Sequence, residues 1–381
     1  MFERIRNNTL TIIISVMILM CFAGYLANRD AVFSESENRY LAARPKLTPA
    51  GLADGSFMEQ FELYTEERLP LRDMMIRLKA VTEQIQLKNE NNGIARGKDG
   101  FLFEKLVKTD EQLNKNKAAL VNFAGKCGRD INICIVPNSC EILEDKLPAG
   151  FPGVSQKSEI GDLYASLLTY DNVNTIDVSD TLSEHRDEYI YYRTDHHWTT
   201  QGAYYGYVRL CDEMGLKPVS MDRLSGKRRD VQDFYGTYYS KYKGYGVGPD
   251  ILTYYDIPVS YYEAGGESHD GMYDTGKLKV YDKYAMFMYG NEGLATVRSM
   301  PDEGEDKRSE LILFKDSYSN CLTPFLTYNY DTITVVDLRY YNRPVDELLG
   351  EHEDADILLL YNFMHYNEDN HFYRLVTNRA D

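Results

Sequence analysis

The pattern of hydrophobic positions predicts that strands and helices alternate from residue 96 to the end of the chain. Runs of strand length that are apolar throughout are followed by amphipathic stretches of helical length. Strands are expected at residues 101–103, 131–136, 173–178, 310–315, 332–337 and 356–361, and helices at 110–125, 158–169, 200–214, 318–328 and after 361. Apolar strands separated by helices are typical of a mostly parallel sheet that is covered on both faces. We therefore predict an α/β fold for residues 96–381.

Two segments depart from this alternation. Residues 218–305 are rich in glycine and tyrosine, contain many turn signals and show little helical period. This texture indicates a β-rich insertion in the α/β domain. Residues 29–95 are polar, with scattered apolar positions at helical spacing. We expect this second segment to form a helical stalk or cap.

The chain begins with a long apolar run. Thr9–Ala27 contains 19 residues without a charge, and a helix of this length spans about 28 Å, close to the hydrocarbon thickness of a bilayer. Arg4 and Arg6 precede the run, which places this end in the cytoplasm. A cleaved signal peptide and a buried core helix are the alternatives, but the run is long and the residues before Asn28 make a poor cleavage site. We predict a cytoplasmic stub and transmembrane anchor at residues 1–28, and a location of the remainder outside the cytoplasm, at the cell membrane.

Composition narrows the possible partners. The chain has 59 acidic and 42 basic side chains, a formal charge of -17, which argues against binding to duplex nucleic acid. The six cysteines include no C-x-x-C pair, so a structural zinc site and a disulfide scaffold are not expected. A disulfide between Cys134 and Cys140 stays possible for an exported domain.

Candidate chemistry lies where an apolar strand stops. In LFKDSYSN (residues 313–320) Ser317 follows a strand and precedes an expected helix, and the carboxyl ends of parallel strands are where α/β sheets build their sites. Backbone N–H groups at the start of that helix could stabilise an oxyanion. A serine needs a base to become a nucleophile, and the base needs a carboxylate to orient it. Asp195 and His197 could supply both if their loop faces Ser317.

Four segments, in this order, resemble the DHHW family. They are SENRYLAARPKLT (36–48), GKDGFLF (97–103), TDHHWTTQGAYY (194–205) and FKDSYSN (314–320). That family is similar to the SGNH-hydrolase-like domains of extracytoplasmic alginate O-acetylation proteins. The resemblance implies an SGNH-hydrolase-like sheet, with Asp195 orienting the base His197 and with Ser317 as the nucleophile. Trp198 occupies the tryptophan position of the motif, and Lys315 stands where relatives have a glycine.

Further contacts to a substrate or an oxyanion are expected from three residues. Asn138 follows the strand at 131–136, Trp198 belongs to the motif, and Arg339 lies beside Asp337 at the end of the strand at 332–337. No cofactor and no metal are expected.

The resemblance implies an O-acetyltransferase or acetylesterase that is membrane-anchored, extracytoplasmic and active on a cell-surface or secreted polysaccharide. It also implies a multi-spanning membrane acyltransferase as a partner that supplies acetyl groups.

Other interpretations of the same residues stay open. Asp195, His196 and His197 could bind a divalent metal, or the two histidines could cap the helix that begins near Thr199. Asp316 and Ser317 could serve only as a helix N-cap. The alternative function is a non-catalytic glycan-binding or assembly factor that retains the SGNH-like fold.

Overall fold

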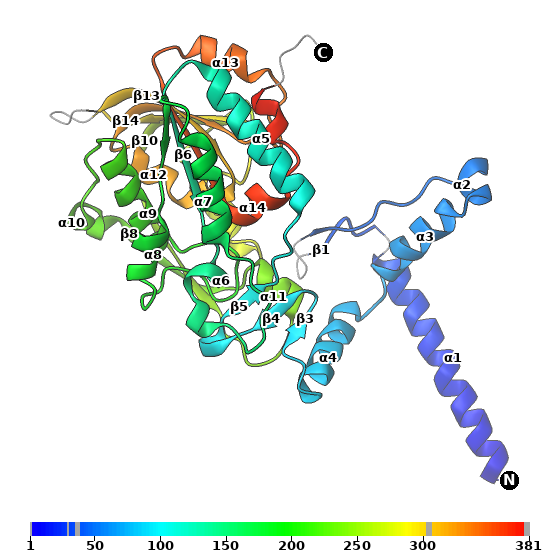
Figure 1. Ribbon diagram of the computed structural model, residues 1–381. Coiled ribbons are helices and arrows are strands. Elements are labelled where there is room, and N and C mark those ends of the chain that lie inside the picture. Colours follow the sequence, from blue (N-terminus) through cyan, green and yellow to red (C-terminus); the bar gives the residue numbers. More distant parts are fainter. Residues whose placement is uncertain (1, 29, 35–38, 302–306, 377–381) are drawn as a thin grey trace. The chain divides into compact units, whose positions relative to one another are not determined.

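The computed structural model describes residues 2–28, 30–34, 39–301 and 307–376. It divides into two compact units, residues 1–91 with 243–245, and residues 92–242 with 246–381 (Figure 1). The predicted boundaries after residues 28 and 95 stay a prediction. All six cysteines are free thiols, so the Cys134–Cys140 disulfide is not formed.

The first unit is helical. Its helices are α1 (Phe2–Asn28), α2 (Pro49–Ala53), α3 (Ser56–Glu66) and α4 (Arg72–Ile85), with short strands β1 (Phe33–Ser34), β2 (Arg39–Tyr40) and β3 (Glu90–Asn91). Thr48 begins α2 because its hydroxyl oxygen accepts the Gly51 N–H. Within the described part of the chain, no helix has the combination of length and apolarity that a membrane crossing requires. The predicted transmembrane anchor therefore lacks support from the structure.

The second unit is a mixed α/β domain with a mostly parallel central sheet. The strands lie in the order β11-β10-β12-β14-β13-β15-β6-β7. Neighbours from β14 to β7 pair in parallel, and neighbours from β11 to β14 are antiparallel. The parallel strands are β6 (Ile131–Val136), β7 (Val173–Thr175), β13 (Arg308–Lys315), β14 (Tyr330–Val336) and β15 (Asp356–Asn362).

Helices cover both faces of this sheet (Figure 1). One face packs against α5 (Asp110–Cys127), α7 (Gln156–Leu167), α13 (Val345–Glu351) and α14 (Phe363–Glu368), and the other against α8 (Ser179–Glu184), α9 (Thr200–Glu213) and α12 (Thr323–Leu326). Side chains alternate along each strand, so Ile312 and Phe314 of β13 face α5, while Leu311 and Leu313 face the opposite layer. Both faces of the strand are buried, which explains its continuous apolar run.

The insertion differs from its prediction in one respect. Residues 218–305 contain strands, but β10 (Val259–Ala264), β11 (Glu267–His269) and β12 (Leu294–Ser299) extend the central sheet and do not leave it. β12 pairs with β14 and buries Val297, so the insertion covers an edge that would otherwise expose unpaired backbone groups.

The remaining elements are short. β4 (Ile94–Arg96) pairs with β5 (Leu102–Glu104), and β8 (Arg228–Phe234) pairs with β9 (Asp250–Tyr255). The short helices are α6 (Ser139–Ile142), α10 (Met221–Leu224) and α11 (Thr237–Tyr242). The helix predicted at 318–328 is wrong as a single element: a 3₁₀ helix, η6 (Ser317–Cys321), precedes α12, with Leu322 between them and Pro324 in the first turn of α12. Proline has no N–H with which to continue a preceding helix.

Candidate active site

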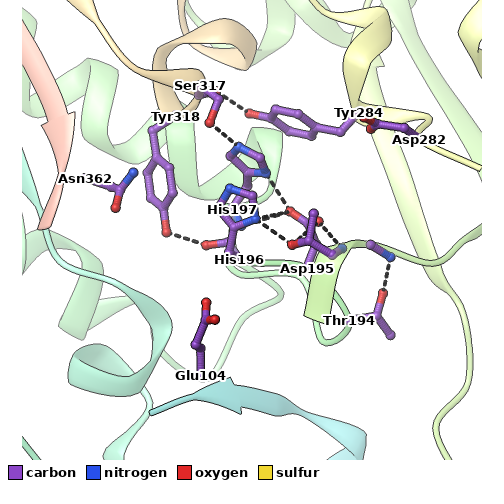
Figure 2. A network of polar contacts seen from close by, with 12 residues as sticks. Glu104, Thr194, Asp195, His196, His197, Asp282, Tyr284, Ser317, Tyr318 and Asn362 are labelled. Carbon is purple, nitrogen blue, oxygen red and sulfur yellow. Dashed lines mark hydrogen bonds and ion pairs between the residues drawn. The ribbon is translucent and has the colours of Figure 1, made fainter. Parts of the chain in front are cut away.

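Ser317 lies at the carboxyl end of β13, where the chain turns into η6. Asp316 holds this turn in place. One of its carboxylate oxygens accepts the Tyr318 N–H at 2.8 Å, and the other accepts the backbone and side-chain N–H groups of Asn362, at the end of β15, at 2.7 and 2.6 Å. Asp316 is thus the N-cap that the sequence allowed for, and the Ser317 hydroxyl takes no part in that cap and points toward His197 (Figure 2).

The structure brings Asp195, His197 and Ser317 into one hydrogen-bonded chain (Figure 2). His197 Nε2 lies 2.7 Å from Ser317 Oγ, and His197 Nδ1 lies 2.5 Å from Asp195 Oδ1. Asp195 and His197 are buried, whereas Ser317 is half-buried. In the neutral imidazole, a proton on Nδ1 donates to the carboxylate and leaves Nε2 free to accept the serine proton. This is the geometry that a base-activated serine requires.

Two residues of the insertion hold the Asp195 carboxylate. Its Oδ2 accepts the Thr237 N–H at 2.8 Å and the Thr237 hydroxyl at 3.2 Å. The backbone at Gly236 passes so close that an added Cβ would overlap the Asp195 side chain. Burial opposes ionisation of Asp195, but His196, His197 and the Thr237 N–H outweigh it and lower the pKa of this carboxyl below its ordinary value. Asp195 is therefore held both in position and in its charged form.

Asp250, the first residue of β9, holds the loop that carries Asp195 through hydrogen bonds to the two residues before Asp195. The Asp250 carboxylate accepts the Arg193 N–H at 3.0 Å, the Thr194 N–H at 2.8 Å and the Thr194 hydroxyl at 2.5 Å. Burial raises the pKa of Asp250. These bonds satisfy backbone groups that would otherwise be unpaired in the core.

His196 lies next to both His197 and Asp195, with its Nδ1 3.6 Å from Asp195 Oδ1. Its ring centroid is 3.7 Å from that of His197, and its Nδ1 is 2.7 Å from Thr237 Oγ1. Burial, together with the proximity of His197, lowers the pKa of His196 to about 4. His196 is thus neutral near pH 7. The interpretation of the histidines as helix caps is wrong, because Thr199 caps α9 through its hydroxyl oxygen and the Gly202 N–H.

Asp195, His196 and His197 also place one potential ligand atom each within 4.8 Å of one another. Both Asp195 oxygens and both His197 nitrogens are already engaged in the hydrogen bonds described above. A metal ion would have to displace these contacts, so the arrangement favours proton transfer over metal binding.

Trp198 and Asn138 support the turn at Ser317 from inside the core. Trp198 is fully buried and donates its indole N–H to the Tyr318 carbonyl at 2.9 Å, which differs from the predicted contact with substrate. The Asn138 amide donates to the Tyr318 hydroxyl at 2.9 Å and accepts the Met364 N–H at 3.0 Å. Asn138 thus braces the residue after Ser317, and its role as an oxyanion donor stays a prediction.

Arg339 and Lys315 belong to an ionic cluster around the buried Asp337. Arg339 makes two parallel bonds to Asp337, at 2.9 and 2.5 Å, and its side chain is partly exposed. Its contact with a substrate stays a prediction. Lys315 donates to Asn291 and Asn320, both at 2.8 Å. Burial lowers the pKa of Lys315 to about 8. The lysine that replaces the motif's glycine therefore ties η6 to the loop before β12.

Sequence reasoning missed Thr237, Gly236 and Tyr284. The Tyr284 ring stacks on His197, with centroids 3.7 Å apart and an angle of 11° between the planes. All three residues lie in the insertion, far from the motifs in sequence. Gly236 carries only a general turn signal, and nothing distinguishes Tyr284 among 32 tyrosines.

The structure is a mixed α/β domain with a mostly parallel central sheet that carries a hydrogen-bonded serine, histidine and aspartate. Comparisons identify its family. The model of the DHHW protein family matches residues 109–336, more than half of the sequence, so this chain belongs to the DHHW family. The resemblance noted in the sequence is thereby confirmed. No curated protein matches the chain.

Solved structures share the fold. A DHHW family protein from Eubacterium siraeum is 24% identical, with a TM-score of 0.62 over 75% of this chain and 95% of its own. PatB1 of Bacillus cereus, in a structure with a sulfonyl adduct, is 17% identical, with a TM-score of 0.60 over 74% and 98% of the two chains. The O-acetyltransferase domain of Pseudomonas putida AlgJ is 13% identical, with a TM-score of 0.43 over 73% and 93%. At these identities the likeness to the first two structures concerns the fold alone.

Proposed function

We propose that this protein is a serine-type O-acetyltransferase or acetylesterase. The observation that carries the proposal is the 2.7 Å distance between His197 Nε2 and Ser317 Oγ, with Asp195 on the other ring nitrogen. A hydroxyl on a half-buried residue can meet a substrate, while the buried imidazole and carboxylate are shielded from water. This combination suits nucleophilic catalysis.

In the proposed reaction, the Ser317 oxygen attacks the carbonyl carbon of an acetyl ester while its proton passes to His197 Nε2. The tetrahedral intermediate then collapses, the bond to the donor alcohol breaks, and His197 returns the proton to that alcohol. An acceptor hydroxyl next loses its proton to His197 and attacks the acetyl-serine. Ser317 leaves with the proton from His197. Asp195 stabilises the imidazolium at each stage.

The acceptor decides between transfer and hydrolysis. We propose a polysaccharide hydroxyl as the acceptor, with water as the alternative. The family resemblance supports this choice. On the same family resemblance, we propose that a multi-spanning membrane acyltransferase supplies the acetyl group.

The full-length chain can be tested with a chromogenic acetyl ester in the absence and presence of an oligosaccharide acceptor. Ser317→Ala should reduce the rate by about 10³-fold or more. Ser319→Ala is the matched control, because it lies in the same 3₁₀ helix and its buried hydroxyl donates to the Leu360 carbonyl. Equal rates for wild type and Ser317→Ala would contradict the proposed enzymatic function. If the rates are equal and Ser317→Ala still binds the glycan, the non-catalytic glycan-binding factor is favoured.

The location outside the cytoplasm is a separate proposal. Its support is the charge-free run Thr9–Ala27, in which large apolar side chains such as Ile14 and Leu19 are exposed. Fractionation of cells that express wild type and an Ile14→Asp, Leu19→Asp variant tests it. Membrane association should be lost in the variant, and a wild-type chain in the soluble cytoplasmic fraction would contradict the proposal.

A further inference from the structure

Tyr284 touches both the base and the nucleophile of the candidate active site. Its ring lies nearly parallel to the His197 imidazole, with centroids 3.7 Å apart. Its hydroxyl donates to the backbone carbonyl of Ser317 at 3.0 Å (Figure 2). The side chain is buried, and burial raises the pKa of its hydroxyl well above the ordinary value. Tyr284 is therefore a neutral hydrogen-bond donor near pH 7.

The His197 ring is enclosed on both faces. Tyr284 covers one face, and His196 covers the other at a centroid distance of 3.7 Å. The edges of the ring are held by Asp195 and Ser317. Rotation of the imidazole about its side-chain bonds would have to displace at least one of these neighbours, so the ring has a single orientation.

The element that carries Tyr284 is itself anchored. Tyr284 begins the 3₁₀ helix η5 (Tyr284–Met286), and the preceding Lys283 donates to the carbonyls of Gln232 and Asp233 at 3.0 and 2.9 Å. The ring also meets Phe287 at 5.1 Å. These contacts connect η5 to the end of β8, directly before the Gly236–Thr237 segment that holds Asp195.

We propose that Tyr284 is a positioning residue. It holds the His197 ring and the Ser317 backbone in place relative to each other, and its ring face stabilises the imidazolium of His197. This role rests on the proposed function. A cation over an aromatic face is attracted by the ring quadrupole, and this attraction exists only after His197 has taken the serine proton. The ring thus stabilises the transition state more than the resting enzyme. The hydroxyl contributes by fixing the backbone that carries the nucleophile.

The test is steady-state kinetics of the full chain with the acetyl ester for Tyr284→Leu, Tyr284→Phe and Ser317→Ala. Tyr284→Leu should lower kcat about 5- to 30-fold with KM within about two-fold, because the lost interaction forms in the transition state. Tyr284→Phe keeps the ring and should recover most of kcat. Tyr284→Met is measured alongside, so that a folded variant without an aromatic ring is obtained if the leucine variant unfolds.

Tyr204→Leu is the matched control. Tyr204 is also buried, is also packed against an aromatic ring, and donates to the Val219 carbonyl at 2.8 Å, but it contacts no member of the triad. Wild-type kcat in the folded leucine or methionine variant, or a loss equal to that of Tyr204→Leu, would overturn the role of Tyr284. A loss confined to KM would overturn it as well. An active Ser317→Ala variant would instead contradict the proposed function itself.

Discussion

The α/β frame, that is, the parallel strands and the helices that cover them, and the insertion at residues 218–305 contribute different groups to the same candidate site. The frame supplies the three side chains of the candidate site, since Ser317 begins η6 just after the parallel strand β13, and Asp195 and His197 lie just before α9. The insertion supplies the groups that hold them, with Thr237 on the Asp195 carboxylate and Tyr284 on the His197 ring. A parallel sheet can thus place a candidate nucleophile at the carboxyl ends of its strands. The candidate base is held by contacts from the insertion.

The largest loss of activity is expected from a substitution in the frame. Asp195→Asn should lower kcat by about 10³- to 10⁴-fold, because the amide N–H can donate to Nδ1 and favour the wrong imidazole tautomer, and because the neutral amide cannot stabilise the imidazolium. Steady-state kinetics and thermal unfolding of the same samples check this. Asp180→Asn, an exposed aspartate paired with Lys157, serves as the control. Equal kinetics for these two variants would show that the carboxylate takes no part in the reaction.

A smaller effect is expected in the insertion. Gly236→Ala should force the backbone away from Asp195, because the added methyl group would overlap that side chain. We expect a loss of about 10- to 100-fold in kcat and about 1–3 kcal/mol in the free energy of unfolding. Gly226→Ala, in the same insertion with nothing within 4 Å of its added Cβ, should change neither quantity much. Similar results for both variants would mean that the insertion only covers the sheet edge.

The smallest expected effect is a dependence of the free energy of unfolding on pH, through His196. The folded-state pKa of His196 is lowered to about 4, against an ordinary value of 6.5. Between these values the unfolded chain binds more protons, so the contribution of His196 to stability is complete above pH 6.5 and decreases as the pH falls toward 4. We expect a loss of about 1–2 kcal/mol over this range in wild type, which allows for the partial exposure of the ring.

Denaturant unfolding of wild type and His196→Asn at several pH values measures this contribution. The variant should show a weaker dependence between pH 6.5 and 4, because asparagine carries no proton to take up. Parallel stability curves for the two proteins would indicate that His196 is protonated in the fold near its ordinary pKa.

Local patterns predicted the frame well. The strand at 131–136 is found with the predicted bounds as β6, and the apolar run at 310–315 lies within β13. Such strands are buried on both faces, so their composition alone marks them. The four segments that resemble the DHHW family are short, and together they predict the family that the comparison confirms.

The place of the insertion in the central sheet and its contacts with the candidate site were not predicted, because both arise between residues far apart in the sequence. The strands β10 to β12 find their partners in a sheet edge that sequence alone does not reveal. Trp198 was expected at the substrate, but it is fully buried. Arg339 is paired with Asp337, and its contact with a substrate stays a prediction. A motif position shows that a residue is near a site, while its burial and its hydrogen-bond partner decide whether it can reach a ligand.

Covalent labelling tests the central claim most directly. The full chain is treated with a sulfonyl fluoride, the reagent class that converts an activated serine into a sulfonyl ester with loss of fluoride, and the labelled peptide is identified by mass spectrometry. The account predicts one sulfonyl group on Ser317, much slower labelling in His197→Ala, and no label on the corresponding peptide of Ser317→Ala. A folded wild-type protein that stays unlabelled, or that is labelled at another residue, would contradict it.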